Sequence, residues 1–189
     1  MSDFTLTARS PLGGVQLDFD GVTIAEVSNM AIVSLATPHG GEDALAKAVR
    51  SAYGTGLPAV GQSAKSKAGG ARFLGLARDQ AFLLFDEPGG NPLDAIAKDV
   101  IEAAYLTDQS DSWAILRISG PKARAALERI CPLDLHPSAF PEGHVARTMM
   151  EHLGVIILRE GPDTFLLMSA RSYAGSFLHA VETSVRNII

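Results

Sequence analysis

Short runs of alternating apolar and polar residues predict most of the β-strands of this chain. Residues 15–19 alternate in this way, Asp20-Gly21 follows, and a second apolar run begins at Val22, a pattern typical of a β-hairpin with glycine in its turn. Further strands are predicted at residues 30–35, 72–76, 81–85, 113–118, 146–150, 155–159 and 164–168.

Apolar residues at helical spacing predict helices between these strands. One helix is expected at residues 42–53, where acidic residues come first and basic residues later, as the helix dipole favours. A second is expected at residues 92–104, with proline in its first turn. A third follows the turn Ser119-Gly120-Pro121, because proline lacks the N–H that a first helical turn leaves without a partner.

The last stretch of the chain predicts one more helix. Phe177 and Val181 belong to its apolar stripe, and we expect Ser169 or Ser172 to cap its first turn. By contrast, residues 54–71 are rich in glycine, serine, lysine and proline and predict a loop.

Each half of the chain therefore reads as strand, helix, two or three strands and helix. Helices that return to one face of an antiparallel sheet indicate an α+β fold, and we interpret it as two ferredoxin-like halves. The expected halves are residues 1–105 and residues 106–189, joined in one compact unit.

Composition narrows the class of protein. The 189 residues are 47% hydrophobic, enough for a packed core, and the formal charge of −5 argues against a nucleic-acid partner. No apolar run is long enough to span a membrane and no signal peptide is visible, so we expect a soluble, cytoplasmic protein. The single cysteine, Cys131, has apolar neighbours and is expected to be a buried core residue.

The search for chemical motifs yields no catalytic residue, no metal site and no assigned cofactor-binding residue. Gly54-Thr55-Gly56 lacks the third glycine of a dinucleotide-binding turn, and none of the five histidines falls in a zinc-binding spacing. Asp108 and Asp111 precede a strand, where capping of a turn is favoured over proton sharing.

An ordered series of short segments carries a family resemblance. Residues 107–121, with the sequence TDQSDSWAILRISGP, lead into a helix, and Cys131-Pro132-Leu133-Asp134, Ala146-Arg147-Thr148 and Arg171-Ser172-Tyr173-Ala174 follow in that order. This series resembles the gamma subunit of heterotetrameric sarcosine oxidase. It is also similar to the folate-binding domain of the glycine-cleavage aminomethyltransferases. The resemblance covers roughly the second half of the chain.

The resemblance implies a non-catalytic subunit that supports assembly of a larger enzyme. Its partners would be the alpha subunit with NAD and tetrahydrofolate, the beta subunit with FAD and FMN, and the delta subunit with zinc. That complex demethylates sarcosine oxidatively to glycine, with hydrogen peroxide and either formaldehyde or methylenetetrahydrofolate. Two alternatives stay open: a free-standing folate-binding or aminomethyltransferase-like module, and the gamma subunit of a related N-methyl amino-acid dehydrogenase.

Two arginines in the quoted segments are candidate anchors. The guanidinium groups of Arg147 and Arg171 could each bind a partner subunit or an internal carboxylate, because guanidinium makes paired hydrogen bonds. The loop at residues 54–71, with Lys65, Lys67 and Arg72 in or beside it, is a second candidate contact, and we expect a partner to order it.

Overall fold

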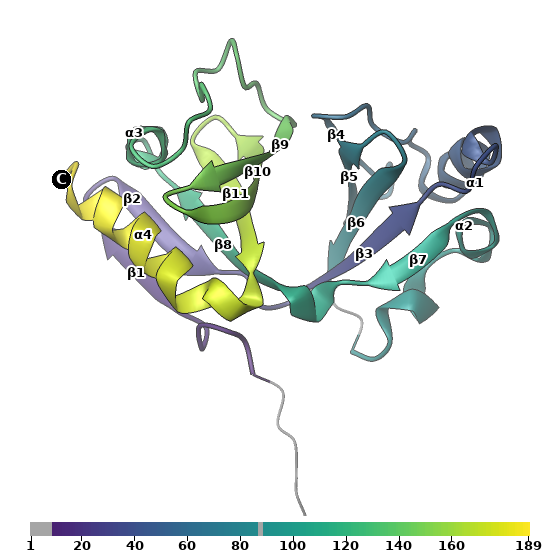
Figure 1. Cartoon of the computed structure of the whole chain (residues 1–189), viewed down its shortest axis with the longest axis horizontal. Helices are drawn as coiled ribbons and strands as arrows, with labels where there is room; N and C mark the ends of the chain where they lie inside the picture. Colours follow the sequence, from purple (N-terminus) through teal and green to yellow (C-terminus); the bar gives the residue numbers. More distant parts are fainter. Residues whose placement is uncertain (1–8, 87–88) are drawn as a thin grey trace, which may run out of the picture.

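Two antiparallel sheets form the framework of the protein (Figure 1). The computed structural model describes residues 9–86 and 89–189. Within these residues, a six-stranded sheet has the order β1 (Gln16–Phe19), β2 (Val22–Glu26), β8 (Trp113–Ser119), β11 (Thr164–Ala170), β10 (Leu153–Gly161) and β9 (Val145–Met150). A five-stranded sheet has the order β4 (Ser63–Lys65), β5 (Ala71–Ala77), β6 (Gln80–Asp86), β3 (Met30–Ala36) and β7 (Tyr105–Asp108).

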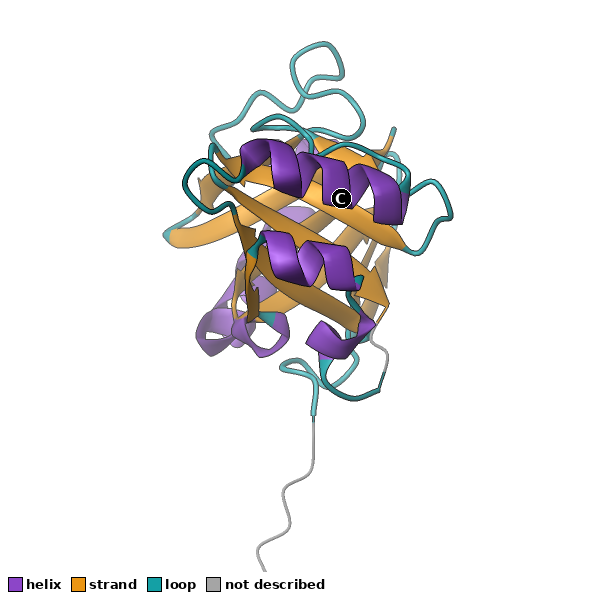
Figure 2. Ribbon diagram, turned by 90° about the vertical axis from the view of Figure 1, so that its right-hand side faces the viewer, coloured by secondary structure: helices purple, strands orange, loops and turns teal. Residues whose placement is uncertain are grey.

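Helices cover the outer face of each sheet (Figures 1 and 2). The five-stranded sheet carries α1 (Glu42–Tyr53) and α2 (Lys98–Ala103), and the six-stranded sheet carries α3 (Ala123–Glu128) and α4 (Ala174–Arg186). The described residues also form three 3₁₀ turns: η1 (Pro92–Ala95), η2 (Ser110–Ser112) and η3 (Arg171–Tyr173). The layers therefore run helix, sheet, sheet, helix, and the α+β class is confirmed.

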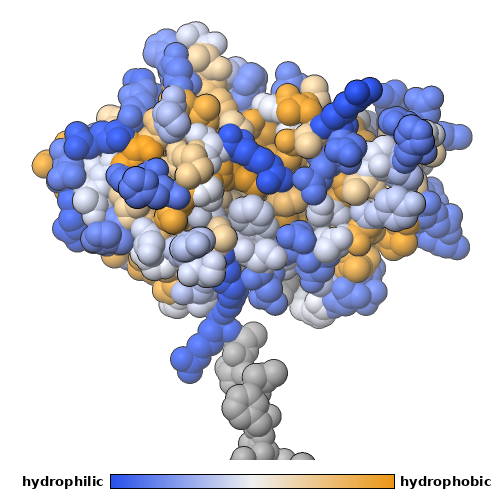
Figure 3. Space-filling view, in the orientation of Figure 1, coloured by the Kyte–Doolittle hydropathy of each residue, from blue (hydrophilic) through white to orange (hydrophobic). Residues whose placement is uncertain are grey.

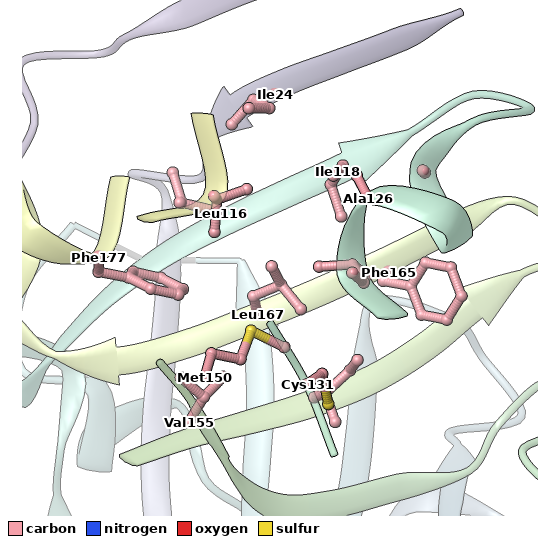
Figure 4. Packing of buried hydrophobic residues seen from close by; sticks show 14 of the residues in the cluster. Ile24, Leu116, Ile118, Ala126, Cys131, Met150, Val155, Phe165, Leu167 and Phe177 are labelled. Atoms are coloured by element: carbon pink, nitrogen blue, oxygen red, sulfur yellow. The ribbon is translucent and has the colours of Figure 1, made fainter. Parts of the chain in front are cut away.

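Three apolar clusters fill the spaces between these layers. One lies between the six-stranded sheet and its helices, where Phe177 of α4 points toward Leu116 and Leu167 (Figure 4). A second lies beneath α1 and α2, and the third joins the two sheets face to face. The third, here called the inter-sheet core, contains Ile32, Leu74, Leu76, Phe82, Leu84, Ile115, Val145, Ile156, Leu158, Leu166 and Met168.

Strand periodicity explains how one strand serves two clusters. In β8, Leu116 and Ile118 face the helices, whereas Ile115 faces the other sheet. Successive side chains of a strand point to opposite faces, so a sheet covered on both sides needs apolar residues at consecutive positions. The run Phe165–Met168 in β11 is buried throughout for this reason.

The two sheets share one strand arrangement. In the five-stranded sheet, α1 connects β3 to the hairpin region of β5, and β6 lies between β3 and β5. In the six-stranded sheet, α3 leads from β8 toward β9 and β10, and β11 lies between β8 and β10. This is the split βαβ order of ferredoxin-like units. The strand on the far side of β3 is β7, and the strand on the far side of β8 is β2.

The N-terminal hairpin therefore lies in the sheet built mainly from the second half of the chain. Strand β2 pairs with β8 from Thr23↔Ser119 to Glu26↔Leu116. The division of the chain into residues 1–105 and 106–189 stays a prediction, but the strands are not distributed between the sheets along that division.

Three local predictions are wrong. The helix expected at residues 92–104 is two short helices, because Ile96 is extended and buried beneath the five-stranded sheet. Ser169 lies in β11, where its hydroxyl donates to the Gly154 carbonyl at 3.0 Å, and α4 starts only after η3 without a side-chain cap from Ser172.

The third concerns the predicted loop at residues 54–71, which contains the short strand β4 and is held by hydrogen bonds to its own chain. Its contact with a partner stays a prediction. The Lys67 N–H donates to the Tyr53 carbonyl at 2.9 Å, and β4 pairs with β5 inside this segment. The Ser63 N–H donates to the Gly143 carbonyl at 2.8 Å, and the Val145 N–H donates to the Gly61 carbonyl at 3.0 Å. Because Gly143 and Val145 adjoin or belong to β9, these bonds join the edges of the two sheets.

Candidate functional site

The candidate anchor Arg171 lies in a cleft of 820 Å³ at one end of the two sheets. Its Nη2 donates to the Arg9 carbonyl at 2.6 Å, and its Nη1 lies 3.4 Å from the Asp111 carboxylate. The Asp111 side chain is fully exposed to water, so this ion pair contributes little to stability. Arg171 thus ties the start of the described chain to the segment before β8.

The wall of this cleft includes Trp113 of β8. The indole ring packs edge-on against Phe82 with ring centroids 5.8 Å apart. Its Nε1–H is buried and finds no hydrogen-bond acceptor among residues 9–86 and 89–189. The two arginines that line the cleft, Arg9 and Arg171, are matched by Asp108 and Asp111, so the lining has no excess of either charge.

Asp108 has the turn-capping role that the sequence indicates. Its Oδ1 accepts hydrogen bonds from the Ser110 N–H at 2.9 Å and from the Ser110 hydroxyl at 2.7 Å. The Ser110 hydroxyl oxygen in turn accepts from the Ile32 N–H at 3.0 Å. This chain of bonds joins β7 to β3 and positions the entry into β8.

Arg147 lies elsewhere, at an exposed position of β9 on the strand face that is turned toward the other sheet. Its Nη2 donates to the Gln80 Oε1 at 3.2 Å, and its guanidinium carbon is 5.7 Å from the centre of the Phe82 ring. Both contacts cross from the six-stranded sheet to β6 of the five-stranded sheet. Arg147 is not part of the wall around Arg171, so the structure does not bring the two candidate anchors into one site. Their contact with a partner stays a prediction.

A third arginine, Arg159, was not singled out by the sequence pattern and is the most buried of the three. Only 3% of it is exposed, and its Nη1 donates to the carbonyls of Leu135 and Phe140 at 3.1 and 3.0 Å. Its Nε donates to the Gly161 carbonyl at 3.1 Å, and its Nη2 donates to that of Pro162. Arg159 therefore fixes the loop between α3 and β9 against β10.

The described residues hold no group of three or more histidine, cysteine or acidic side chains placed to bind a metal ion. Among the helices of the described ranges, none is both long enough and apolar enough to cross a membrane.

Large apolar side chains reach the surface at separate places, and Figure 3 shows apolar surface between charged side chains on the face drawn there. Tyr105 is 71% exposed at the start of β7, and Ile101 of the preceding helix is 43% exposed. Strand β7 is an edge of its sheet and pairs only with β3 among the described strands. Tyr173, which follows Arg171, is 55% exposed.

The comparison with known families identifies the family of this chain. The sequence profile of the sarcosine oxidase, gamma subunit family matches residues 37–185. The chain belongs to the sarcosine oxidase gamma subunit family. The matched range includes all four segments that carry the resemblance, from Thr107 to Ala174.

Individual members of this family show the same relation. The chain is 33% identical to the sarcosine oxidase subunit gamma of Corynebacterium sp. (strain P-1) over 141 residues, which cover 74% of this chain and 67% of that subunit. It is 28% identical to the subunit gamma of Corynebacterium sp. (strain U-96), covering 95% and 90% of the two chains. The match to the Arthrobacter sp. subunit, at 30% identity, covers 64% of this chain and 60% of that subunit.

Solved structures agree with the family. A chain of the heterotetrameric sarcosine oxidase from Corynebacterium sp. U-96, in complex with pyrrole 2-carboxylate, superposes with a TM-score of 0.79 and 27% identity over 95% of both chains. The glycine-cleavage aminomethyltransferase T of Bartonella henselae shares the fold, with a TM-score of 0.58 and 18% identity over 82% of this chain and 44% of that chain. The expected likeness to the aminomethyltransferase fold is confirmed.

Proposed function

We propose that this chain is the gamma subunit of a heterotetrameric sarcosine oxidase and that it supports assembly of the complex without an active site of its own. The observation that carries the proposal is the likeness to a chain of such a heterotetramer over 95% of both chains. A similarity of that extent covers both sheets and their helices, so it includes the surfaces available to partners.

The proposal assigns the chemistry to other subunits. The partners are the alpha, beta and delta subunits, with FAD, FMN, NAD, zinc and tetrahydrofolate bound to them, as the family resemblance implies. A cytoplasmic complex is part of the proposal.

We further propose that a partner subunit covers the edge of the five-stranded sheet at β7. Tyr105 is the most exposed of the large apolar side chains in the described part of the chain. Aromatic residues are enriched in protein interfaces, and an edge strand presents backbone N–H and C=O groups for pairing. An exposed tyrosine on an edge strand is therefore better suited to a partner than to water.

The assembly role is tested by expressing the other subunits with and without this chain. We expect the complete set to co-purify and to produce hydrogen peroxide from sarcosine, and the set without this chain to assemble poorly. Equal yield and equal activity in its absence would contradict the proposal. Reduction of an electron acceptor without peroxide would instead indicate a related N-methyl amino-acid dehydrogenase.

The proposed surface has a matched pair of variants. Tyr105→Glu places a charge on the β7 edge, whereas Tyr173→Glu places the same charge on another exposed tyrosine. We expect Tyr105→Glu to reduce co-purification with the partner subunits by about tenfold or more, as loss of an interface aromatic commonly does, and Tyr173→Glu to reduce it less. The reverse order would move the interface to the cleft around Arg171.

The alternative of a folate-binding module has its own test. Titration of the isolated chain with tetrahydrofolate would show saturable binding if that module were the correct description. The comparisons do not favour this alternative, because the aminomethyltransferase likeness is one of fold.

A further inference from the structure

A second, smaller pocket opens between the two sheets beside Gly69 and Gly70. Its volume is 220 Å³. One side of the pocket is apolar and belongs to the rim of the inter-sheet core, and the other side carries the basic residues Lys65 and Arg72. The apolar side is formed by Met30, Leu84, Leu158 and Leu166.

The register of the sheet places the two basic residues together. Lys65 of β4 is paired with Arg72 of β5, and Arg72 is paired with Leu84 of β6. Because Leu74, two residues along β5, belongs to the inter-sheet core, Arg72 shares that inner face. Lys65 and Arg72 also line an adjoining pocket of 340 Å³, together with Ser63 and Gly143.

Arg72 carries an unmatched donor. Its Nη1 is buried and has no hydrogen-bond acceptor within residues 9–86 and 89–189, and none of the ion pairs found there involves Arg72. Burial lowers the pKa of this guanidinium from its ordinary value, although the charges of Glu160 and Glu142 act in the opposite direction. A buried donor without an acceptor is rare in folded proteins, because its desolvation is not compensated.

The acidic groups around the pocket are otherwise engaged or exposed. The Glu160 carboxylate accepts a hydrogen bond from the Arg117 Nε at 2.8 Å, so its charge is already matched. Asp86 at the rim and Glu142 in the adjoining pocket are exposed to water. Among the described residues, the group of this pocket that lacks a hydrogen-bond partner is therefore the Arg72 Nη1.

We propose that this pocket binds a small organic carboxylate with an apolar body, whose carboxylate accepts hydrogen bonds from Arg72 and Lys65. Guanidinium is the side chain best suited to a carboxylate, because it offers parallel N–H donors. The volume fits: an apolar cavity of about 150 Å³ holds benzene, so 220 Å³ accommodates one ring or branched alkyl group next to its carboxylate. The apolar body lies against Leu84, Leu158 and Leu166.

This inference does not depend on the proposed assembly role. It concerns a ligand of the chain itself, and Arg171 and Tyr105 do not line the pocket. Failure of the assembly test leaves the pocket test unaffected, and the reverse also holds.

Benzoate titrated into the full chain, followed by calorimetry, is the direct test, with benzamide as the uncharged compound of the same shape. We expect saturable binding of benzoate, binding of benzamide weaker by about tenfold or more, and amide NMR shifts that centre on Gly69 and Gly70. Absence of saturable benzoate binding, or equal binding of both compounds, would overturn the proposal.

Variants locate the site. Arg72→Met is expected to weaken benzoate binding by about tenfold or more while leaving the melting temperature equal or higher, because it removes a buried N–H donor that has no acceptor among the described residues. Arg78→Met is the matched control, since Arg78 is exposed in the turn at the other end of the same hairpin, and it should bind like the wild type. Should Arg72→Met not fold, Lys65→Met decides, because unchanged affinity in that variant contradicts the site.

Discussion

Two arginines, Arg159 and Arg72, show that one residue type has opposite roles in this chain. Arg159 directs its N–H groups at four carbonyl oxygens and lies over the Phe165 ring, 5.3 Å from its centre. Arg72 is half-buried, and its buried Nη1 has no acceptor among residues 9–86 and 89–189. A satisfied buried cation stabilises the surrounding loop, whereas an unsatisfied one costs stability and is available to a ligand.

Replacement of Arg159 tests the first role. Arg159→Met leaves the carbonyls of Leu135 and Phe140 without their donor, so we expect the free energy of unfolding to fall by about 2–4 kcal/mol. Arg129→Met, at an exposed position, is the control and should change it by less than about 0.5 kcal/mol. Urea denaturation measures both, and equal values for the two variants would contradict the anchoring role.

Cys131 gives a prediction that depends on pH. The residue is 6% exposed, and burial is the main cause that raises the pKa of its thiol. The folded-state pKa lies above the unfolded-state value of about 8.5, so the stabilisation is complete below that pH and is lost as pH rises through the folded-state pKa. Between pH 8 and pH 10, the wild type should therefore lose more stability than Cys131→Ala.

Thiol labelling checks the burial itself. Under native conditions we expect a thiol reagent to modify Cys131 only on the timescale of unfolding, because the thiolate is disfavoured and the sulfur is covered. Complete modification within seconds, without loss of structure, would contradict this.

The residue scale also shows where sequence patterns stop being informative. The apolar neighbours of Cys131 were enough to predict that it is buried. Arg159 is followed by Glu160 at the end of a strand and resembles an exposed position, because the carbonyls that satisfy it come from residues 135 and 140. Arg72 lies in a predicted strand, but the pocket beside it is formed only when the second sheet packs against the first.

At the scale of elements, the Ser119-Gly120-Pro121 turn requires glycine at its centre for a reason that the sequence shows only in part. Gly120 adopts φ +114°, and a Cβ there would lie 2.5 Å from the Gly21 carbonyl oxygen. The Lys122 N–H donates to that same oxygen at 3.1 Å. The turn that leads into α3 is thus packed directly on the β1–β2 hairpin.

Alanine substitutions separate this close approach from ordinary glycine effects. Gly120→Ala should lower the free energy of unfolding by about 3 kcal/mol, since the φ angle disfavours a side chain and backbone would have to move. Gly175→Ala lies in α4 with open space around it and should be neutral or stabilising by up to about 1 kcal/mol. Thermal unfolding of both proteins provides the comparison, and a neutral Gly120→Ala would contradict the packing.

Most strands could be predicted because their apolar residues are consecutive or alternate over five or more positions. Helix boundaries were harder to predict from the sequence, and residues 92–104 show the reason. The spacing there is compatible with a helix, but Ile96 must reach the cluster beneath α1, and the chain becomes extended to place it there. The three-residue strand β4 is defined only by its register with β5 and could not be read from its own sequence.

For the whole molecule, the inter-sheet core makes each sheet depend on the other. Ile156 of β10 is 2% exposed and lies in this core with Ile32 and Phe82 of the opposite sheet. Ile156→Ala should lower the free energy of unfolding by about 2–5 kcal/mol, with one transition and with faster hydrogen exchange in both sheets.

Ile101→Ala is the control for that experiment, because Ile101 is 43% exposed and its loss should change stability by well under that amount. Two separate transitions, or faster exchange confined to the six-stranded sheet, would show that the halves unfold independently. That result would support a division near residues 105 and 106.

The position of the β1–β2 hairpin in the six-stranded sheet affects how the nascent chain folds during translation. Residues 16–26 leave the ribosome well before β8, the strand with which β2 pairs, because β8 begins only at residue 113. Contacts between such distant residues slow folding, and unpaired strands promote association with other chains. During translation β2 lacks this partner strand until residues 113–119 have emerged, and over that interval its edge is open to a chaperone or to a neighbouring nascent chain.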